Sequence, residues 1–339
     1  MKTIFVVDDN NVSLLSADEA LSAFYRVFTM PSAFSMLELL QDVKPDLILL
    51  DILMPDMDGF EALKLMRSSS SYADIPVIFL TSRNDTLTET LGFELGAIDF
   101  ISKPFSKPVL LNRIKTYLEI EEIVRERTNR LIKMKNTIVS VLANMVENRD
   151  IMIGSHIERV TRYIRLLLDS MVEHKVYYNE ISKWDLESVI AASCLHDIGK
   201  IVITDLMLSK PGSLTKDEYE TIKTHVIEGE KIIDCIVTES GDEFFLQNAK
   251  LFASYHHERW DGLGYPYGLK GTEIPLQGRL MAIADVYDAL VTERPYKQVL
   301  THEEAEKVVI GNSGTHFDPK LVDVFRDVSE SFKNVILQR

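Results

Sequence analysis

The sequence predicts a multidomain protein: an α/β domain with a doubly wound parallel sheet, a long coiled-coil helix, and a mostly α-helical domain. Three observations support this fold class. The first 120 residues alternate short apolar runs with segments of helical spacing, residues 109–153 contain neither glycine nor proline, and strand patterns are scarce after residue 148. With 339 residues, the chain is long enough for two domains that each have a hydrophobic core.

The composition disfavours several functional classes. The chain has 37 basic and 52 acidic residues, a net charge of −15, which argues against a nucleic-acid surface. The N-terminal MKTIFVV is too short for a signal peptide or a membrane span. Cys194 and Cys235 are the only cysteines, so no disulfide framework is implied. We therefore expect a cytoplasmic protein that binds neither nucleic acid nor membrane.

Short apolar runs that end in polar residues predict the strands of the first domain. These runs are TIFVVDD, DLILLDILMP, PVIFLTS and FISKPF, and the segments NVSLLSADEALSAFYRV and GFEALKLMRSS between them have helical spacing. Strands and helices that alternate in this way form a parallel sheet with helices on both faces. The active crevice of such a sheet lies at the carboxyl ends of its strands.

Five polar side chains fall at these strand ends. Asp8, Asp9 and Asp51 would repel one another unless a cation lay among them, and sites with oxygen ligands alone suit Mg²⁺. Thr81 and Lys103 add a hydroxyl and a positive charge, which a phosphoryl group on an aspartate would need. Any one of the five alone would more simply be a strand-end cap, but together they favour a phosphorylation site.

The stretches VVDD, LLDILMPDMDGF, PVIFLTS and DFISKPF resemble the receiver domain of bacterial response regulators, over residues 1–120. The resemblance implies phosphorylation of Asp51 by a cognate sensor histidine kinase. It also places an aromatic switch at Phe100. The magnesium and phosphoryl site that it implies consists of Asp8, Asp9, Asp51, the Leu53 carbonyl, Thr81 and Lys103.

A repeat of three and four residues indicates a helical coiled-coil linker over residues 107–147. Nine of its eleven positions are apolar, and the positions are Leu110, Arg113, Tyr117, Ile120, Val124, Arg127, Leu131, Met134, Ile138, Val141 and Met145. Such a run favours a parallel coiled coil and hence a homodimer. The alternative is a single amphipathic helix packed on its own domain.

The helical domain contains all eight histidines of the chain. A lone histidine on a helix is usually a hydrogen-bonded core residue. Burying many such groups together is costly without an ion, so a cluster indicates a metal site. The cluster that the sequence suggests is His156, His196, Asp197, His225, His256, His257 and Asp285. We expect His174 and His302, which lack partners in this pattern, at the surface.

Imidazole and carboxylate ligands suit iron, manganese or zinc. A central carboxylate can bridge two such ions. Two ions about 3.5–4 Å apart activate water and stabilise the attacking and leaving oxygens of a phosphodiester. A small anionic substrate is compatible with the acidic chain when metal ions locally reverse the field.

Residues 148–339 resemble the HD-GYP family, a branch of the HD phosphohydrolases that hydrolyses cyclic di-GMP. The stretches that carry the resemblance are ENRD, GSHIERV, LHDIGKIVI, KPGSLT, HHERWDGLGYP, RLMAIADVYDAL, RPYK and GTHFDP. The resemblance implies one metal bound by His156, His196, Asp197 and Asp285, and a second bound by Asp197, His225, His256 and His257. The implied cofactors are two transition-metal ions, iron in the first place and manganese as the alternative.

The same resemblance assigns the residues around the substrate. Asp197 and Lys200 would be catalytic, and Lys200, Arg294 and Lys297 would contact the phosphates of cyclic di-GMP. Tyr265, in the GLGYP loop beside the paired histidines, can offer a ring and a hydroxyl to the substrate. The product would be linear pGpG, GMP or both. Some family members have a glutamate four residues before the first ligand histidine, where it helps to hold a third metal. Met152 occupies this position here, and because a thioether cannot replace a carboxylate we expect two ions.

Two alternative functions remain at this point. One is an HD hydrolase that acts on another cyclic dinucleotide or on the linear product. The other is a regulator that binds the nucleotide or a partner without turnover. The complete set of seven ligands disfavours the second alternative, because a binding module has no need of them.

Overall fold

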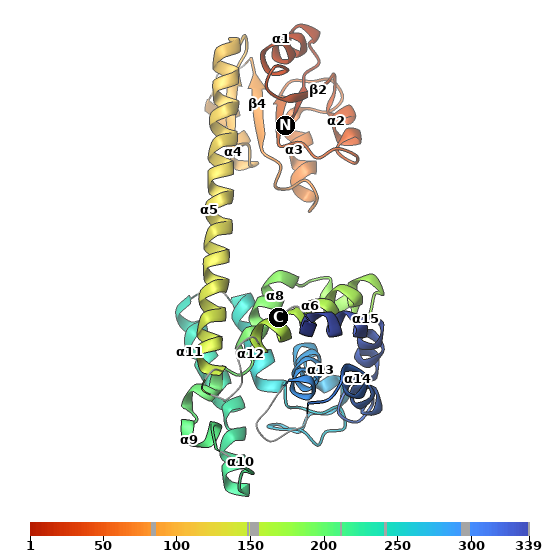
Figure 1. Cartoon of the computed structure of the whole chain (residues 1–339). Helices are drawn as coiled ribbons and strands as arrows, with labels where there is room; N and C mark the ends of the chain where they lie inside the picture. Colours follow the sequence, from red (N-terminus) through yellow and green to blue (C-terminus); the bar gives the residue numbers. More distant parts are fainter. Residues whose placement is uncertain are drawn as a thin grey trace. The chain divides into compact units, whose positions relative to one another are not determined.

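The computed structural model describes residues 1–82, 86–147, 149, 156–210, 212–240, 243–292 and 299–337. The chain divides into two compact units, Met1–Arg130 and Leu131–Arg339. The division falls inside α5 (Lys107–Glu147), the long helix in yellow in Figure 1. In the described parts of the chain, no helix combines the length and the apolar character needed to span a membrane.

The first unit is built on a five-stranded parallel sheet in the order β2-β1-β3-β4-β5. The strands are β1 (Thr3–Val7), β2 (Arg26–Met30), β3 (Leu47–Asp51), β4 (Val77–Thr81) and β5 (Asp99–Ser102). The helices are α1 (Asn11–Leu21), α2 (Ala33–Leu39), α3 (Gly59–Ser68), α4 (Thr86–Glu94) and the first part of α5. Separate apolar clusters cover the two faces, one with α1 and α5 and the other with α2 and α3. The predicted doubly wound sheet is confirmed.

One element of this unit differs from its prediction. Residues 11–27 have helical spacing throughout, but α1 ends at Leu21 and β2 begins at Arg26. β2 lies at the edge of the sheet and only Met30 in it is fully buried. An edge strand needs no continuous apolar run, which explains why the pattern did not reveal it.

The second unit is mostly helical, as predicted. Its longer helices are α6 (His156–Glu173), α11 (His225–Ser240), α12 (Glu243–Tyr255), α13 (Leu276–Val291), α14 (His302–Gly311) and α15 (Pro319–Leu337). Shorter helices are α7 (Tyr178–Ile181), α8 (Leu186–Ala192), η1 (Ser193–Leu195), η2 (Ile198–Val202), α9 (Asp205–Leu208), α10 (Lys216–Lys223) and η3 (Gly271–Glu273).

The core of the second unit is rich in aromatic rings. The rings of Tyr163 and Phe332 stack at 4.4 Å between centroids, and Tyr287 lies edge-on to Phe332 at 5.1 Å. Tyr163 comes from α6, Tyr287 from α13 and Phe332 from α15, so the aromatic core joins three helices. Two of these helices also supply site residues, His156 and Asp285, and the core therefore fixes the spacing between them.

The helix α5 covers the segment for which the sequence predicts a long helix. Leu110, Ile114 and Leu118 are buried in the first unit. At the other end, Ala143 packs against Ile157 of the second unit. Ten apolar residues from Ile120 to Met145 have exposed side chains. Seven lie at positions of the predicted repeat, Ile120, Val124, Leu131, Met134, Ile138, Val141 and Met145, and Ile123, Ile132 and Leu142 lie outside it.

Candidate metal centre

The first unit brings together the carboxylates that the sequence places at strand ends. Asp8, Asp9 and Asp51 each offer an oxygen, and these oxygens lie within 4.8 Å of one another. The Lys103 ammonium lies 2.6 Å from Asp8 Oδ2 and 2.9 Å from Asp51 Oδ1. Burial raises the pKa of Asp51, and the bond from Lys103 opposes that effect. The arrangement suits a hard cation with oxygen ligands.

Thr81 and Leu53 complete the predicted set in this unit. Thr81 is buried at the end of β4, and its carbonyl accepts a hydrogen bond of 2.7 Å from the Lys103 backbone N–H. Leu53 follows β3 by two residues and has an exposed side chain. Phe100 points into the core, where its ring centroid lies 5.5 Å from that of Phe79.

In the second unit, helix ends position most of the predicted ligands. His156 is the first residue of α6, and His225 is the first residue of α11. His196 and Asp197 join η1 to η2, and His256 and His257 directly follow α12. Asp285 lies within α13. We call these seven residues the metal cluster.

Hydrogen bonds fix the proton of four of these imidazoles on Nδ1. The Nδ1 atoms of His196, His225 and His256 lie 3.0, 2.6 and 3.0 Å from the backbone carbonyls of Ser193, Ile222 and Phe252. His156 Nδ1 lies 2.7 Å from Asp288 Oδ2. Carbonyl and carboxylate oxygens only accept, so each Nδ1 donates and each Nε2 of a neutral ring keeps a free lone pair.

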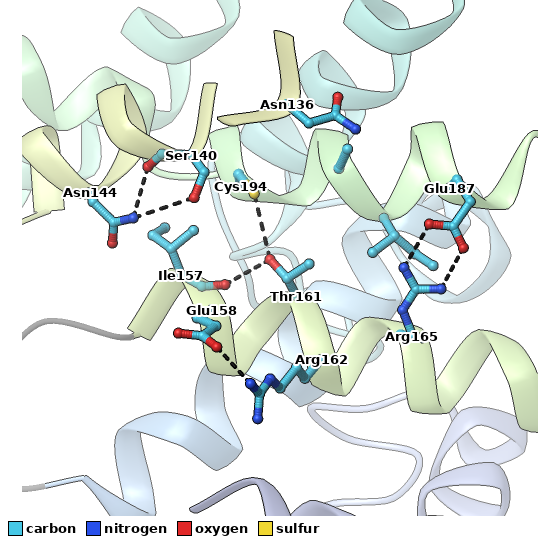
Figure 2. A pocket seen from close by; sticks show the side chains of 12 residues that line it. Asn136, Ser140, Asn144, Ile157, Glu158, Thr161, Arg162, Arg165, Glu187 and Cys194 are labelled. Carbon is cyan, nitrogen blue, oxygen red and sulfur yellow. Dashed lines mark hydrogen bonds and ion pairs between the residues drawn. The ribbon is translucent and has the colours of Figure 1, made fainter. Parts of the chain in front are cut away.

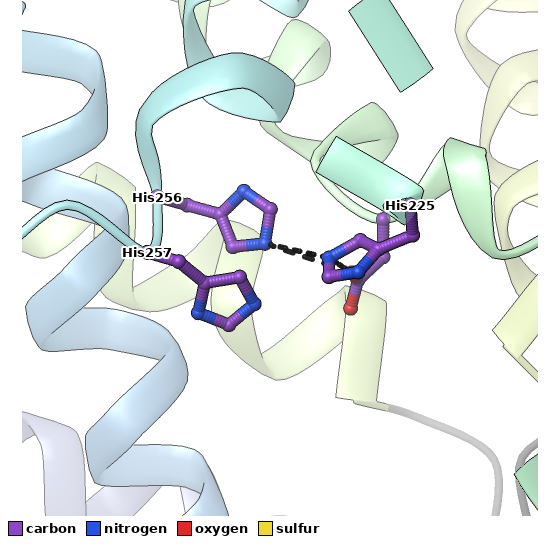
Figure 3. Close-up of side chains that lie close together, drawn as sticks. His225, His256 and His257 are labelled. Atoms are coloured by element: carbon purple, nitrogen blue, oxygen red, sulfur yellow. Dashed lines mark hydrogen bonds and ion pairs between the residues drawn. The ribbon is translucent and has the colours of Figure 1, made fainter. Parts of the chain in front are cut away.

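These lone pairs point toward one another. His225 Nε2 lies 3.4 Å from His256 Nε2, and Figure 3 shows the two rings facing each other with His257 beside them. Asp197 Oδ1 lies 3.2 Å from the same His225 nitrogen. Two nitrogen lone pairs and a carboxylate oxygen at such distances repel one another, and a bound cation removes that repulsion.

Among the described residues of the second unit, three ligand sets satisfy the geometry of a metal site. They are Asp197 with His225, His256 and His257; His156 with His196 and Asp285; and Glu147 with His156 and Asp197. His196 Nε2 and Asp197 Oδ1 are buried without a hydrogen-bond partner in the described structure. Mixed imidazole and carboxylate donors of this kind fit divalent transition metals. Burial and the neighbouring imidazole of His256 lower the pKa of His257, which favours the neutral ring that binds metal.

Asp288 is a functional residue that the sequence did not reveal. It is fully buried and accepts bonds of 2.6 and 2.8 Å from the Arg159 guanidinium as well as the bond from His156. Burial alone would raise the pKa of Asp288, but these two partners lower it below its usual value. The signal in the sequence is an acidic residue one helical turn after Asp285, paired with Arg159 one turn after His156.

Lys200 and Tyr265 lie beside the metal cluster. Lys200 Nζ is 2.9 Å from Asp197 Oδ2. The Tyr265 ring stacks on His257 with centroids 4.7 Å apart, and the Tyr265 backbone N–H donates to the His257 carbonyl at 3.2 Å. The loop that carries Tyr265 therefore begins at a predicted ligand and folds back over it.

Glu258 holds this loop in place, and the sequence did not single it out. Its buried carboxylate accepts hydrogen bonds from the backbone N–H groups of Tyr267, Gly268 and Leu269 at 2.7, 3.1 and 3.1 Å. A Cβ atom at Gly264 would lie 2.4 Å from the Arg259 nitrogen, so only glycine allows the backbone to close here.

Other predicted residues lie elsewhere. Arg294, Lys297 and Met152 fall outside the described residues. His174 is exposed, as predicted. The prediction that His302 lies at the surface is wrong: it is buried, with Nδ1 at 2.7 Å from the Tyr287 hydroxyl. Its polar partner lies in the core, and sequence spacing gave no sign of it.

A groove of about 500 Å³ lies along α5, α6 and α8, and Figure 2 shows the side chains that line it. Arg165 and Glu187 bridge α6 and α8 there with a bond of 2.7 Å. Thr161 Oγ1 lies 3.5 Å from Cys194 Sγ across the same groove. The groove contains none of the predicted metal or substrate residues.

The comparisons with known proteins agree with this organisation. The HD domain family matches residues 120–321, and the response regulator receiver domain matches residues 4–115. A Vibrio cholerae serotype O1 protein named "Probable cyclic di-GMP phosphodiesterase" is 38% identical over 98% of this chain and 79% of its own length. The "Cyclic di-GMP phosphodiesterase response regulator RpfG" of Xanthomonas campestris pv. campestris is 33% identical over 94% and 86%.

A further relative acts on a different nucleotide, according to its name. It is a "3'3'-cGAMP-specific phosphodiesterase 2" of Vibrio cholerae serotype O1, 36% identical over 61% of this chain and 38% of its own length. In this chain the receiver domain match precedes the HD domain match. The chain belongs to the HD domain family, among the response regulators with an N-terminal receiver domain, which confirms the family that its motifs predicted.

Proposed function

We propose that the chain is a two-component response regulator whose output domain hydrolyses cyclic di-GMP to linear pGpG, GMP or both. The observation that carries the proposal is that free imidazole lone pairs converge on Asp197. Relatives that match nearly the whole of this chain have cyclic di-GMP phosphodiesterase in their names. The proposed domains are a receiver over residues 1–120, a connecting helix over 107–147 and a phosphodiesterase domain over 148–339.

The metal cluster would hold two transition-metal ions, iron in the first place and manganese as the alternative. His156, His196 and Asp285 would bind one ion, and His225, His256 and His257 the other. Asp197 would bind both, which its place in the ligand sets supports. Bound ions of this kind lower the pKa of water and offset negative charge on phosphate oxygens.

The remaining residues would bind and orient the nucleotide. Lys200 extends from the turn after Asp197, so its ammonium would attract a phosphate next to the metal cluster. Burial raises the pKa of Tyr265, which keeps the phenol protonated and able to donate a hydrogen bond to substrate. Arg294 and Lys297 would contribute further positive charge, as the family resemblance implies.

The receiver would use Asp51 as phosphoacceptor for a sensor histidine kinase. Mg²⁺ would be bound by Asp9, Asp51 and the Leu53 carbonyl with help from Asp8, and Lys103 and Thr81 would contact the phosphoryl group. The ammonium of Lys103, 2.9 Å from Asp51, supports this role because it would offset the charge added by phosphorylation. We also propose a cytoplasmic protein.

The proposed assembly is a parallel homodimer. Seven exposed apolar residues of α5, from Ile120 to Met145, lie at positions of the predicted repeat, and Ile123, Ile132 and Leu142 are exposed outside it. A seam of this kind is stable when a second helix covers it. The second copy would therefore pack along this face of α5.

The second candidate function is hydrolysis of 3'3'-cGAMP, which the name of one relative favours. Both nucleotides are cyclic dinucleotides with the same phosphodiester linkages, so the metal cluster would serve either. The choice between them depends on the residues that contact the bases.

The test is a rate comparison with anaerobically purified protein loaded with Fe²⁺ or Mn²⁺. We expect faster turnover of cyclic di-GMP than of 3'3'-cGAMP or pGpG. The control is Asp197→Asn, which keeps the volume but removes the bridging charge. We expect its activity to fall by more than the roughly 10–100-fold that loss of an outer metal contact costs. Substantial hydrolysis by Asp197→Asn, or faster turnover of 3'3'-cGAMP, would contradict the proposal.

A further inference from the structure

Glu147 is a buried acid at the very end of α5. Only 4% of its surface is exposed, and neither carboxylate oxygen has a hydrogen-bond partner in the described structure. The helix is anchored there by Ala143, which packs against Ile157 and Cys194. A buried carboxylate is normally paired because its desolvation is costly, so the surroundings of Glu147 must supply a partner of another kind.

Glu147 lies close to the metal cluster. Glu147 Oε1 lies 3.4 Å from His156 Nε2, and Asp285 Oδ1 lies 3.7 Å from the same nitrogen. The neutral ring, which is the form that binds metal, donates its Nδ1 hydrogen to Asp288, so its Nε2 has no hydrogen to offer either carboxylate. Two carboxylate oxygens and a lone pair thus face one another across a space that suits a cation.

A direct hydrogen bond does not explain the contact. A protonated Glu147 could donate to His156 Nε2, but 3.4 Å is well beyond the ordinary length of a bond from an O–H group, about 2.5–3.0 Å. Such a bond would also leave the second oxygen of Glu147 unsatisfied. A metal ion accommodates both oxygens, by bidentate binding or through a water ligand.

We propose that Glu147 is a further ligand of the metal centre and binds the same ion as His156. This deepens the proposed function and rests on its metal centre. His156 has one free lone pair, so it can bind one ion, and a carboxylate next to that lone pair must share the ion. The expected number of ions therefore stays at two. The ion at His156 has carboxylates from Glu147, Asp197 and Asp285, whereas the other ion has three imidazoles and one carboxylate.

The position of Glu147 at the end of α5 would link the receiver to the metal centre. α5 begins in the first unit and ends with Glu147, so the helix that leaves the receiver carries a metal ligand as its last residue. A change at this end of α5 would alter metal binding directly. The metal centre would thus receive its regulatory input through one of its own ligands.

The test is a metal titration of the full chain without nucleotide. Metal-free protein is titrated with Mn²⁺, and binding is followed by calorimetry and by elemental analysis after gel filtration. We expect two ions for the parent. In Glu147→Gln we expect one site unchanged and the other weakened about 10–100-fold. Glu147→Asp should restore part of the loss, and Glu158→Gln, at an exposed acid paired with Arg162, should bind like the parent.

Two sites of parental affinity in Glu147→Gln would overturn the proposal. Should that variant fail to fold, anomalous scattering from Mn²⁺-loaded crystals of the parent decides the matter. An ion about 2.0–2.2 Å from a Glu147 oxygen supports the proposal, and ions bound only elsewhere contradict it. Because the titration contains no nucleotide, two bound ions without cyclic di-GMP hydrolysis would contradict the proposed function alone.

Discussion

Asp288 illustrates how residues outside the metal cluster prepare it for binding. Its carboxylate fixes the His156 hydrogen on Nδ1 and so directs the free lone pair of Nε2 toward Glu147 and Asp285. Arg159 in turn holds Asp288 ionised with two short bonds. The direction in which His156 would bind a metal is therefore set by Asp288 and Arg159, which are not among the proposed ligands.

Replacing Asp288 with asparagine should weaken the ion bound at His156. The amide keeps the volume of the side chain but is a weaker acceptor, and it removes the negative charge that faces the buried Arg159 guanidinium. We expect metal affinity to fall about 10–100-fold. The free energy of unfolding should fall by about 3–5 kcal/mol. Metal titration and chemical denaturation measure the two effects.

The matched control is Asp323→Asn, the same change in an exposed acid that pairs with Arg326 on the surface of α15. It should alter the free energy of unfolding by no more than about 1 kcal/mol and leave metal affinity unchanged. Parental metal affinity in Asp288→Asn would show that Asp288 does not orient His156.

At this scale the sequence predicted the residues of the metal cluster, which the structure brings together, but not the residues that support them. Asp197 and His256 occur in motifs whose residue types and neighbours suggest metal binding. Glu147, Asp288 and Glu258 act through contacts between segments far apart in the chain, and such contacts leave no local pattern. His302 was wrongly placed for the same reason, since its partner Tyr287 lies on another helix.

At the scale of elements, close packing of η2 against α11 brings Asp197 and His225 together. A Cβ atom at Gly199 would lie 1.8 Å from the His225 carbonyl oxygen and 2.5 Å from the Gly229 nitrogen. The backbones therefore touch, which only glycine permits. Asp197 Oδ1 reaches to 3.2 Å from His225 Nε2 as a result.

Gly199→Ala should push η2 away from α11 and disturb the metal cluster. Overpacking of this kind costs about 1–3 kcal/mol of unfolding free energy, and affinity for the ion at His225 should fall with it. The control is Gly311→Ala at the end of α14, where a Cβ atom would meet no described atom within 4 Å. That variant should be neutral or slightly more stable. Thermal unfolding and metal titration compare the two, and equal behaviour would refute the packing argument.

The sequence predicted these elements unevenly. Periodicity and the absence of glycine and proline predicted a long helix in this part of the chain, because a long regular helix repeats one signal many times. β2 was missed because an edge strand has polar as well as apolar positions. The loop after His257 could be predicted as a loop, but its path depends on the buried carboxylate of Glu258.

At the scale of the whole molecule, the proposed dimer depends on the exposed face of α5. Introducing glutamates at Ile138 and Val141 places charge in the seam, which should separate the copies. Light scattering should give the mass of a dimer for the parent and of a monomer for the double variant. Lys133→Glu, at an exposed position outside the repeat, should remain dimeric. An unchanged mass of the double variant, or a monomeric parent, would exclude the coiled coil.

Phosphorylation of Asp51 is the proposed input to the whole chain. The carboxylate lies at the end of a buried strand, and the cation at Lys103 can offset the added charge. A small phosphodonor should therefore label the full-length protein only when Mg²⁺ is present, as Phos-tag electrophoresis or mass spectrometry can measure. Asp51→Asn should abolish labelling, whereas Asp42→Asn, at an exposed acid after α2, should leave it intact.

The same phosphodonor should change the rate of cyclic di-GMP hydrolysis in the parent and in Asp42→Asn but not in Asp51→Asn. Equal labelling of Asp51→Asn and the parent would show that Asp51 is not the phosphorylated residue. Labelling without any change in rate would leave the receiver phosphorylated but uncoupled from the metal centre.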